Sequence, residues 1–228
     1  MDKVINFKYG GYNATVIVPE NANGEWIWKT EFLYAFEQAE VALLGKGYTR
    51  VYYEISDKYG SYKAVRLMYN FYKYVSREFG LRDKCHLFGF SRGGLYAFNF
   101  ALFYPECVAS LYLDAPVLDM KSWPLAGSKE QKQLFDEYSL TEETLKIFKE
   151  NPVDNLGEFF DTNIPVLVIA GEVDELVPLK ENAGVLLDYC EANGIALEYY
   201  VKPTCGHHPH SLEDVEPIVQ FVKRNSVR

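Results

Sequence analysis

The segment Gly89-Phe90-Ser91-Arg92-Gly93-Gly94 constrains the fold of this chain more than any other. A GxSxG pentapeptide between an apolar run and a helical pattern is typical of a sharp strand-to-helix turn that presents a serine at the end of a sheet. Residues 85–90 indicate a short buried strand, and apolar residues recur at helical spacing from Leu95 until Pro105 stops the pattern. The pentapeptide alone is equally compatible with an ordinary glycine-rich turn, so the elements around it must decide.

Strand and helix patterns alternate along the whole chain. The expected strands are 4–9, 12–18, 50–55, 85–90, 108–113, 164–170 and 197–201, and the expected helices begin near Thr30, Ser61, Leu95 and Leu212, with another ending at Ala192. Such alternation predicts an α/β fold: a mostly parallel sheet with helices on both faces and ligands beyond the carboxyl ends of the strands. Residues 115–163 lack strand character, so we expect a small helical cap insert within one domain spanning 1–228.

Composition excludes several classes of partner. A net charge of -9 and a pI near 5.0 argue against a nucleic-acid-binding surface, which needs clustered Lys and Arg. No apolar run reaches the roughly 18 residues of a membrane helix, so we expect no membrane partner. The four cysteines are widely spaced without a CxxC pair, which favours reduced thiols and a cytoplasmic location.

A serine nucleophile needs a base and, usually, a carboxylate that orients the base. Asp174 directly follows the predicted strand 164–170, and His207 follows the predicted strand 197–201, so both should lie at the same sheet edge as Ser91. The order Ser, Asp, His is the one expected for this type of turn. The alternatives are a solvated acidic loop for Asp174 and its acidic neighbours, and His208 as the base.

Two further features of the predicted site concern the oxyanion and the substrate. The backbone N–H of Arg92 should be one oxyanion donor, and the loop 21–29 should supply the other through the N–H of Trp26 or Ile27. Trp26, Trp28 and Trp123 are expected to wall the substrate pocket, although Trp26 and Trp28 could equally pack beneath the loop. For the Arg92 side chain, an ion pair is favoured over a grip on a substrate carboxylate.

His207, His208 and His210 form a histidine cluster that could alternatively hold a metal ion. Adjacent histidines followed by a proline suit one tetrahedral ion poorly, so we expect neither metal nor cofactor. His210 should either orient the loop or face solvent.

The stretches GFSRGG, GEVDELVP and CGHHPHSLED, in this order, resemble the α/β-hydrolase superfamily over nearly the whole chain. With WIW, DKYGS, LYLDAPVLD and GHHPHSL, the sequence is similar to small bacterial members described as esterase-like or peptidase-like. The resemblance implies an α/β-hydrolase fold and acyl transfer through an acyl-enzyme on Ser91, with Asp174 and His207 as its partners. No HG dipeptide follows residues 12–18, where many members carry the oxyanion loop, which puts the second donor in doubt.

Ester hydrolysis is the activity we expect first, on a small carboxylic ester such as an acylated sugar or phenolic. A serine peptidase or amidase is the alternative, because the same triad serves both and specificity resides in the pocket. A peptidase of the oligopeptidase kind usually brings a large extra domain, for which 228 residues leave no room. A non-catalytic binding module is the third hypothesis, although binding alone would not require all three triad residues. The sequence makes no prediction about oligomeric state.

Overall fold

The chain forms one eight-stranded sheet in a computed structural model that describes residues 1–226. The strands are β1 (Lys3–Tyr9), β2 (Tyr12–Val18), β3 (Trp26–Lys29), β4 (Thr49–Tyr53), β5 (Cys85–Phe90), β6 (Val108–Asp114), β7 (Val166–Gly171) and β8 (Glu198–Lys202). Their order in the sheet is β1-β2-β4-β3-β5-β6-β7-β8, with antiparallel pairing from β1 to β4 and parallel pairing from β4 to β8. The predicted mostly parallel sheet is therefore confirmed.

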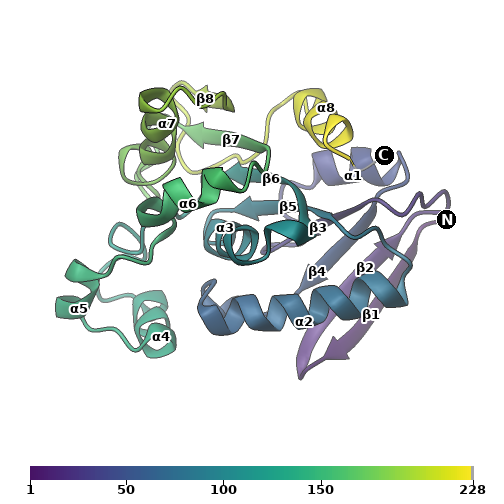
Figure 1. Cartoon of the computed structure of the whole chain (residues 1–228), viewed down its shortest axis with the longest axis horizontal. Coiled ribbons are helices and arrows are strands. Elements are labelled where there is room, and N and C mark those ends of the chain that lie inside the picture. The colour runs from purple at the N-terminus through teal and green to yellow at the C-terminus, as the bar shows by residue number, and fades with distance from the viewer. Residues whose placement is uncertain (227–228) are drawn as a thin grey trace.

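Helices cover both faces of this sheet (Figure 1). They are α1 (Gln38–Leu44), α2 (Tyr62–Glu78), α3 (Gly93–Phe103), α4 (Lys129–Tyr138), α5 (Glu142–Ile147), α6 (Leu156–Asp161), α7 (Ala183–Ala192) and α8 (Glu216–Arg224), with short 3₁₀ helices at Ser56–Lys58, Pro105–Cys107, Pro152–Asn155 and Leu179–Glu181. Buried residues of α2, α3, α6 and α7 form one core cluster with one face of the sheet, and those of α1 and α8 form a second cluster with the other face. Strands β5, β6 and β7 are buried along their whole length, as continuous apolar runs in parallel sheets usually are.

The segment 26–37 differs from the prediction. Trp26 to Lys29 form a buried strand between β4 and β5 instead of part of a loop, and α1 begins at Gln38 instead of near Thr30. The apolar residues at 32, 35 and 36 suggest a helix, but Phe32 and Phe36 have φ values of 58° and 49°, which a right-handed helix does not allow. Residues 30–37 therefore form the loop after β3, at the carboxyl edge of the sheet.

Residues 115–163, the helical insert, connect β6 to β7 and contain α4, α5 and α6 without a strand. Figure 1 shows α4 and α5 projecting away from the sheet. The insert is attached through a third core cluster in which Leu134 and Trp123 pack with Tyr59 and Leu95 of the main body. None of the helices in residues 1–226 has the length and apolar character that a membrane span needs.

Gly171 ends β7 and lies against the loop after β8. A Cβ on Gly171 would overlap the carbonyl oxygens of Cys205 and Gly206, which are backbone atoms and cannot turn away. We expect Gly171→Ala to lower the free energy of unfolding by about 1–3 kcal/mol, the usual cost of overpacking, in urea denaturation. Gly45→Ala is the control, since Gly45 has φ -61° and its nearest neighbour would be 3.5 Å from the new Cβ. Equal stability of the two variants would contradict this account.

Candidate active site

Ser91 occupies the turn between β5 and α3 with φ 51°, a left-handed conformation that is strained for a residue other than glycine. Its N–H donates to the carbonyl of Asp114, at 2.9 Å, and its carbonyl accepts from Val117 N, also at 2.9 Å. Gly93 lets the next chain segment approach, because a Cβ there would lie 2.9 Å from Thr30 Oγ1. The turn therefore has the backbone strain and close packing expected of a nucleophile elbow.

His207 and Asp174 complete a hydrogen-bonded chain that begins at Ser91. His207 Nε2 lies 3.0 Å from Ser91 Oγ, and His207 Nδ1 lies 2.7 Å from Asp174 Oδ2. The other carboxylate oxygen, Asp174 Oδ1, accepts from the N–H groups of Leu176 and Val177, each at 2.9 Å. The His207 and Asp174 side chains are only 8% and 2% exposed, so water competes little for these bonds.

The loops that carry Asp174 and His207 are bonded to each other through their backbones. Val173 N donates to the carbonyl of Cys205 at 3.0 Å, and Glu172 N donates to that of Lys202 at 3.1 Å. The Lys202 ammonium in turn donates to the carbonyls of Pro209 and Ser211. These contacts set the imidazole of His207 between the carboxylate and the hydroxyl.

The geometry suits nucleophilic attack by a serine hydroxyl. With Nδ1 protonated and held by Asp174, Nε2 of His207 is free to accept the Ser91 proton. Positive charge that then develops on the ring faces the Asp174 carboxylate at 2.7 Å. Of the triad candidates, His208 is excluded as the base by this arrangement, because His207 holds both contacts.

A second histidine–carboxylate pair lies beside the first and escaped sequence reasoning. His210 Nδ1 lies 2.8 Å from Asp114 Oδ1, and Asp114 Oδ2 accepts from Ser211 N at 2.7 Å and from the Tyr112 hydroxyl. His210 and Asp114 are both buried, so His210 orients its loop and does not face solvent. The signal was present in the sequence, since Asp114 ends an apolar strand and Asp174 lies just after another.

Trp26 and Trp28 are not where the site prediction put them. Both are at most 1% exposed, and Trp26 lies at the amino end of β3, level with the start of β5, with its indole N–H donating to the carbonyl of Arg82. Ser91 follows the opposite end of β5. Trp26 therefore supplies no oxyanion donor, and neither tryptophan lines the pocket; both pack in the core, the alternative that the sequence left open.

The loop 30–37 lies beside the nucleophile in their place. The Phe32 ring and Ser91 line the same cavity, and the Arg92 guanidinium lies 5.0 Å from the centre of that ring. Within residues 1–226, the N–H groups of Phe32 and Arg92 donate to no protein acceptor. Both residues line the cavity at Ser91, so their N–H groups are candidate donors to an oxyanion.

The Arg92 side chain forms an ion pair with Glu31, which agrees with the ion pair favoured from the sequence. Its Nε and Nη2 lie 3.2 and 3.0 Å from Glu31 Oε2. Glu31 is 1% exposed, and burial raises the pKa of its carboxyl although Arg92 opposes the shift. The guanidinium is thus held beside the nucleophile by a buried carboxylate.

A cavity of about 280 Å³ opens at Ser91. Its walls are mostly apolar, with two charged side chains: Phe32, Trp123, Pro124, Leu125, Leu176, Ser128, Arg92 and Glu130. Trp123 of the helical insert therefore lies where the sequence placed it. The insert forms one side of this cavity and the loop 30–37 the other.

The three histidines His207, His208 and His210 offer nitrogen atoms within 4.8 Å of one another. Two of them already hold carboxylates through Nδ1, so only their Nε2 atoms would face an ion. The metal-free site stays a prediction.

The roles of the tryptophans can be separated by substitution. Trp123→Ala should raise KM several-fold or more for substrates that fill the cavity, because it removes a wall, whereas Trp26→Phe should lower the melting temperature and leave KM unchanged. Steady-state kinetics and thermal unfolding measure the two effects. A raised KM in Trp26→Phe would instead show that Trp26 lines the substrate pocket, as the sequence predicted.

Metal dependence is tested by inhibitors of two kinds. A serine-directed phosphonate should abolish hydrolysis and label Ser91, while a strong chelator should leave the rate unchanged, because Ser91 already has its base at 3.0 Å. Mass spectrometry locates the adduct. Loss of activity with the chelator alone would favour the histidine metal site.

Comparison with known proteins agrees with this geometry. The sequence matches the prolyl oligopeptidase family over residues 44–226, whereas no curated protein matches it. Similar solved structures include dipeptidyl peptidase 4 of Porphyromonas gingivalis, with TM-score 0.72 and 12% identity over 99% of this chain and 35% of that one. A puromycin-hydrolysing peptidase of Mycobacterium tuberculosis gives TM-score 0.70 and 13% identity over 97% of this chain and 38% of the other. The chain thus spans little more than a third of their length, and at such identity they share its fold. By the family match, this chain belongs to the prolyl oligopeptidase family, whose members are serine hydrolases of the α/β-hydrolase fold.

Proposed function

We propose that this protein is a serine peptidase that cleaves an amide bond through an acyl-enzyme on Ser91. The observation that carries the proposal is the hydrogen-bonded chain Ser91–His207–Asp174 at the mouth of a cavity, in a member of the prolyl oligopeptidase family. Two proteins of similar structure are named as peptidases, which favours amide over ester substrates. Peptidase activity, the alternative considered from the sequence, is therefore preferred to the ester hydrolysis that the sequence led us to expect first.

The reaction follows from the positions of the side chains. Ser91 Oγ attacks the scissile carbonyl while His207 Nε2 takes its proton, and Asp174 stabilises the resulting imidazolium. The same Nε2–H then protonates the leaving amine as the C–N bond breaks, which leaves the acyl group on Ser91. Water, deprotonated by His207, attacks the acyl-enzyme, and the proton returns to Ser91 as the acid product leaves.

Stabilisation of the tetrahedral oxyanion is assigned to the backbone N–H groups of Arg92 and Phe32. Both are unpaired within residues 1–226, and Arg92 directly precedes α3 as its N-cap, where the amino end of the helix favours negative charge. Four polar contacts hold the loop that carries Phe32. Lys29 donates to the carbonyl of Ala35, Arg50 donates to that of Leu33 at 3.0 Å, Thr30 Oγ1 donates to that of Gly93 at 2.9 Å, and Glu31 pairs with Arg92. A donor fixed before the reaction costs no reorganisation during it.

Ester hydrolysis remains the second candidate because the triad and the apolar cavity serve both bond types. What separates them is the leaving group, since an amine must be protonated before it departs and an alkoxide or phenoxide needs less help. The comparison must therefore be made with matched acyl groups.

Aminoacyl and dipeptidyl p-nitroanilides should be cleaved by the protein, with kcat/KM exceeding that for the p-nitrophenyl esters of the same acyl groups once each rate is divided by its uncatalysed rate. Ser91→Ala should lower kcat by at least about 10³-fold, and Asp174→Asn should lower it strongly while leaving KM near its original value. Cleavage of esters only would support the esterase instead. Turnover unchanged in Ser91→Ala would rule out Ser91 as the nucleophile, and no turnover of either substrate by the wild type would leave only the binding module.

A further inference from the structure

The loop after β8 brings three histidine rings together next to the nucleophile. The ring centres of His207, His208 and His210 are 4.9 to 5.0 Å apart, and the ring planes cross at 66° to 85°. Each ring offers a nitrogen atom, and these nitrogens all lie within 4.8 Å of one another. Among residues 1–226, no other group of three or more His, Cys, Asp or Glu side chains is placed to hold a metal ion. The proposed reaction needs only His207 of the three.

The spacing of the rings matches the spacing that one tetrahedral ion imposes. Imidazoles whose nitrogens lie about 2.0–2.1 Å from such an ion have ring centres roughly 5 Å apart and nitrogens roughly 3.3 Å apart. The ring centres already meet the first condition. A turn of the rings meets the second, and His208 is exposed, with no hydrogen bond from its ring within residues 1–226. The short spacing of these histidines along the chain is therefore no obstacle to one ion.

Two of the three rings are already oriented as metal ligands are. Nδ1 of His207 lies 2.7 Å from Asp174 Oδ2, and Nδ1 of His210 lies 2.8 Å from Asp114 Oδ1. Histidine ligands almost always donate their other ring N–H to such a group, which fixes the ring and makes the metal-binding nitrogen more basic. Nε2 of each ring is thus left for an ion. Both carboxylates are buried, and their two negative charges would balance the charge of a divalent cation.

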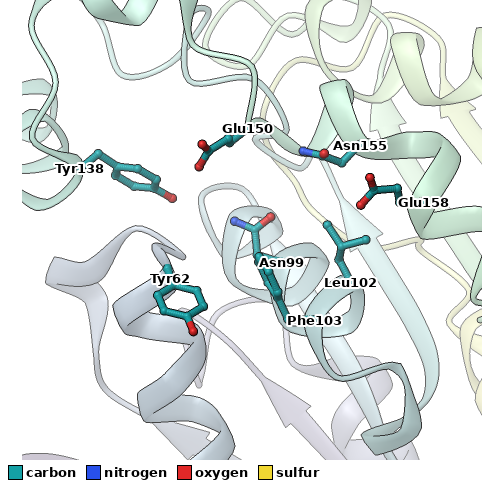
Figure 2. A pocket seen from close by; sticks show the side chains of 8 residues that line it. All are labelled: Tyr62, Asn99, Leu102, Phe103, Tyr138, Glu150, Asn155 and Glu158. Carbon is teal, nitrogen blue, oxygen red and sulfur yellow. The ribbon is translucent and has the colours of Figure 1, made fainter.

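Three imidazole nitrogens select zinc over the hard cations. Zinc and its neighbours in the first transition row bind imidazole well, whereas Ca²⁺ and Mg²⁺ need about six or more oxygen ligands. Oxygen ligands are more frequent in a second cavity, of about 360 Å³, between the helical insert and the body of the protein (Figure 2). Glu150 and Glu158 are the only charged residues among those that line it, and two carboxylates are too few for a hard cation.

We propose that His207, His208 and His210 bind one Zn²⁺ ion and that the bound ion inhibits hydrolysis. His207 Nε2 lies 3.0 Å from Ser91 Oγ, and a lone pair that binds zinc cannot accept the serine proton. The metal-free protein is therefore the active form, and zinc is a reversible inhibitor, not a cofactor. The inhibition rests on the proposed function of Ser91, whereas zinc binding does not.

Hydrolysis of p-nitrophenyl acetate by the full chain, freed of metal by dialysis, measures the inhibition after the rate of Ser91→Ala is subtracted. Zinc chloride should lower the rate in a saturable way, and a chelator should restore it in full. Mg²⁺ and Ca²⁺ at the same concentrations should leave the rate unchanged. An ester is the probe because the test then does not depend on amide cleavage.

Two variants locate the site. His208→Ala should raise the zinc inhibition constant at least about 10-fold, measured against its own metal-free rate, because losing a ligand costs no less than losing the group that orients one. Cys205→Ser is the control: it removes a free thiol three residues away, outside the histidine group, and should leave the inhibition constant unchanged.

Calorimetric titration of Ser91→Ala with zinc chloride measures binding without hydrolysis. This variant keeps all three histidines, so it should bind one zinc ion per chain. Adding His208→Ala should raise the Kd at least about 10-fold, with thermal unfolding of both proteins as the check on folding.

Four results would each overturn the proposal: inhibition unchanged in His208→Ala, inhibition lost in Cys205→Ser, zinc bound without inhibition, or a rate raised by zinc. The last would make the ion a cofactor. If the wild type hydrolyses no substrate but binds zinc through His208, the zinc site stands and the proposed function fails.

Discussion

Parallel pairing of β3 to β8 is the constraint on which the site depends. Parallel strands end at the same edge of a sheet, so side chains that follow different strands meet there although they lie far apart in sequence. Ser91 follows β5, Asp114 ends β6, Asp174 follows β7 and His207 follows β8. Parallel pairing of these neighbouring strands brings Ser91, His207 and Asp174 into one hydrogen-bonded chain, and the loop after β8 also sets His210 against Asp114.

Charges buried near β3 support the loop that closes the site on its other side. Lys29 and Glu40 form an ion pair at 2.6 Å with side chains 2% and 1% exposed, and Arg50 lies beside them. Burial lowers the pKa of Lys29 although Glu40 opposes the shift. Removing this pair of charges from water therefore costs free energy on folding. Removing one member would leave the other buried without its partner, and removing Lys29 would also take the donor from the carbonyl of Ala35, whereas Arg50 holds that of Leu33. This arrangement explains how a loop with two left-handed phenylalanines keeps one conformation.

The helical insert has two faces with different surroundings. On one side Trp123 and Pro124 wall the cavity at Ser91, and on the other Tyr138 and Glu150 wall a second cavity, of about 360 Å³. Its attachment to the body runs through Tyr59, whose ring lies 6.1 Å from that of Trp123 and whose carbonyl accepts from Tyr138. A shift of the insert would therefore change both cavities together.

Local pattern alone determined the strand at 85–90, the elbow at Ser91 and the residues Asp174 and His207, because each depends on a short apolar run followed by a polar residue. The same rule failed for Trp26, since a run of four residues can be read as strand or loop until its partners β4 and β5 are known. The contacts of Asp114 with His210 and of Glu31 with Arg92, and the place of Phe32 beside Ser91, depend on segments that are distant in sequence, so only the tertiary structure decided them. The sequence by itself determined the chemistry of the triad, and folding decided what surrounds it, because long-range packing sets which groups lose their water.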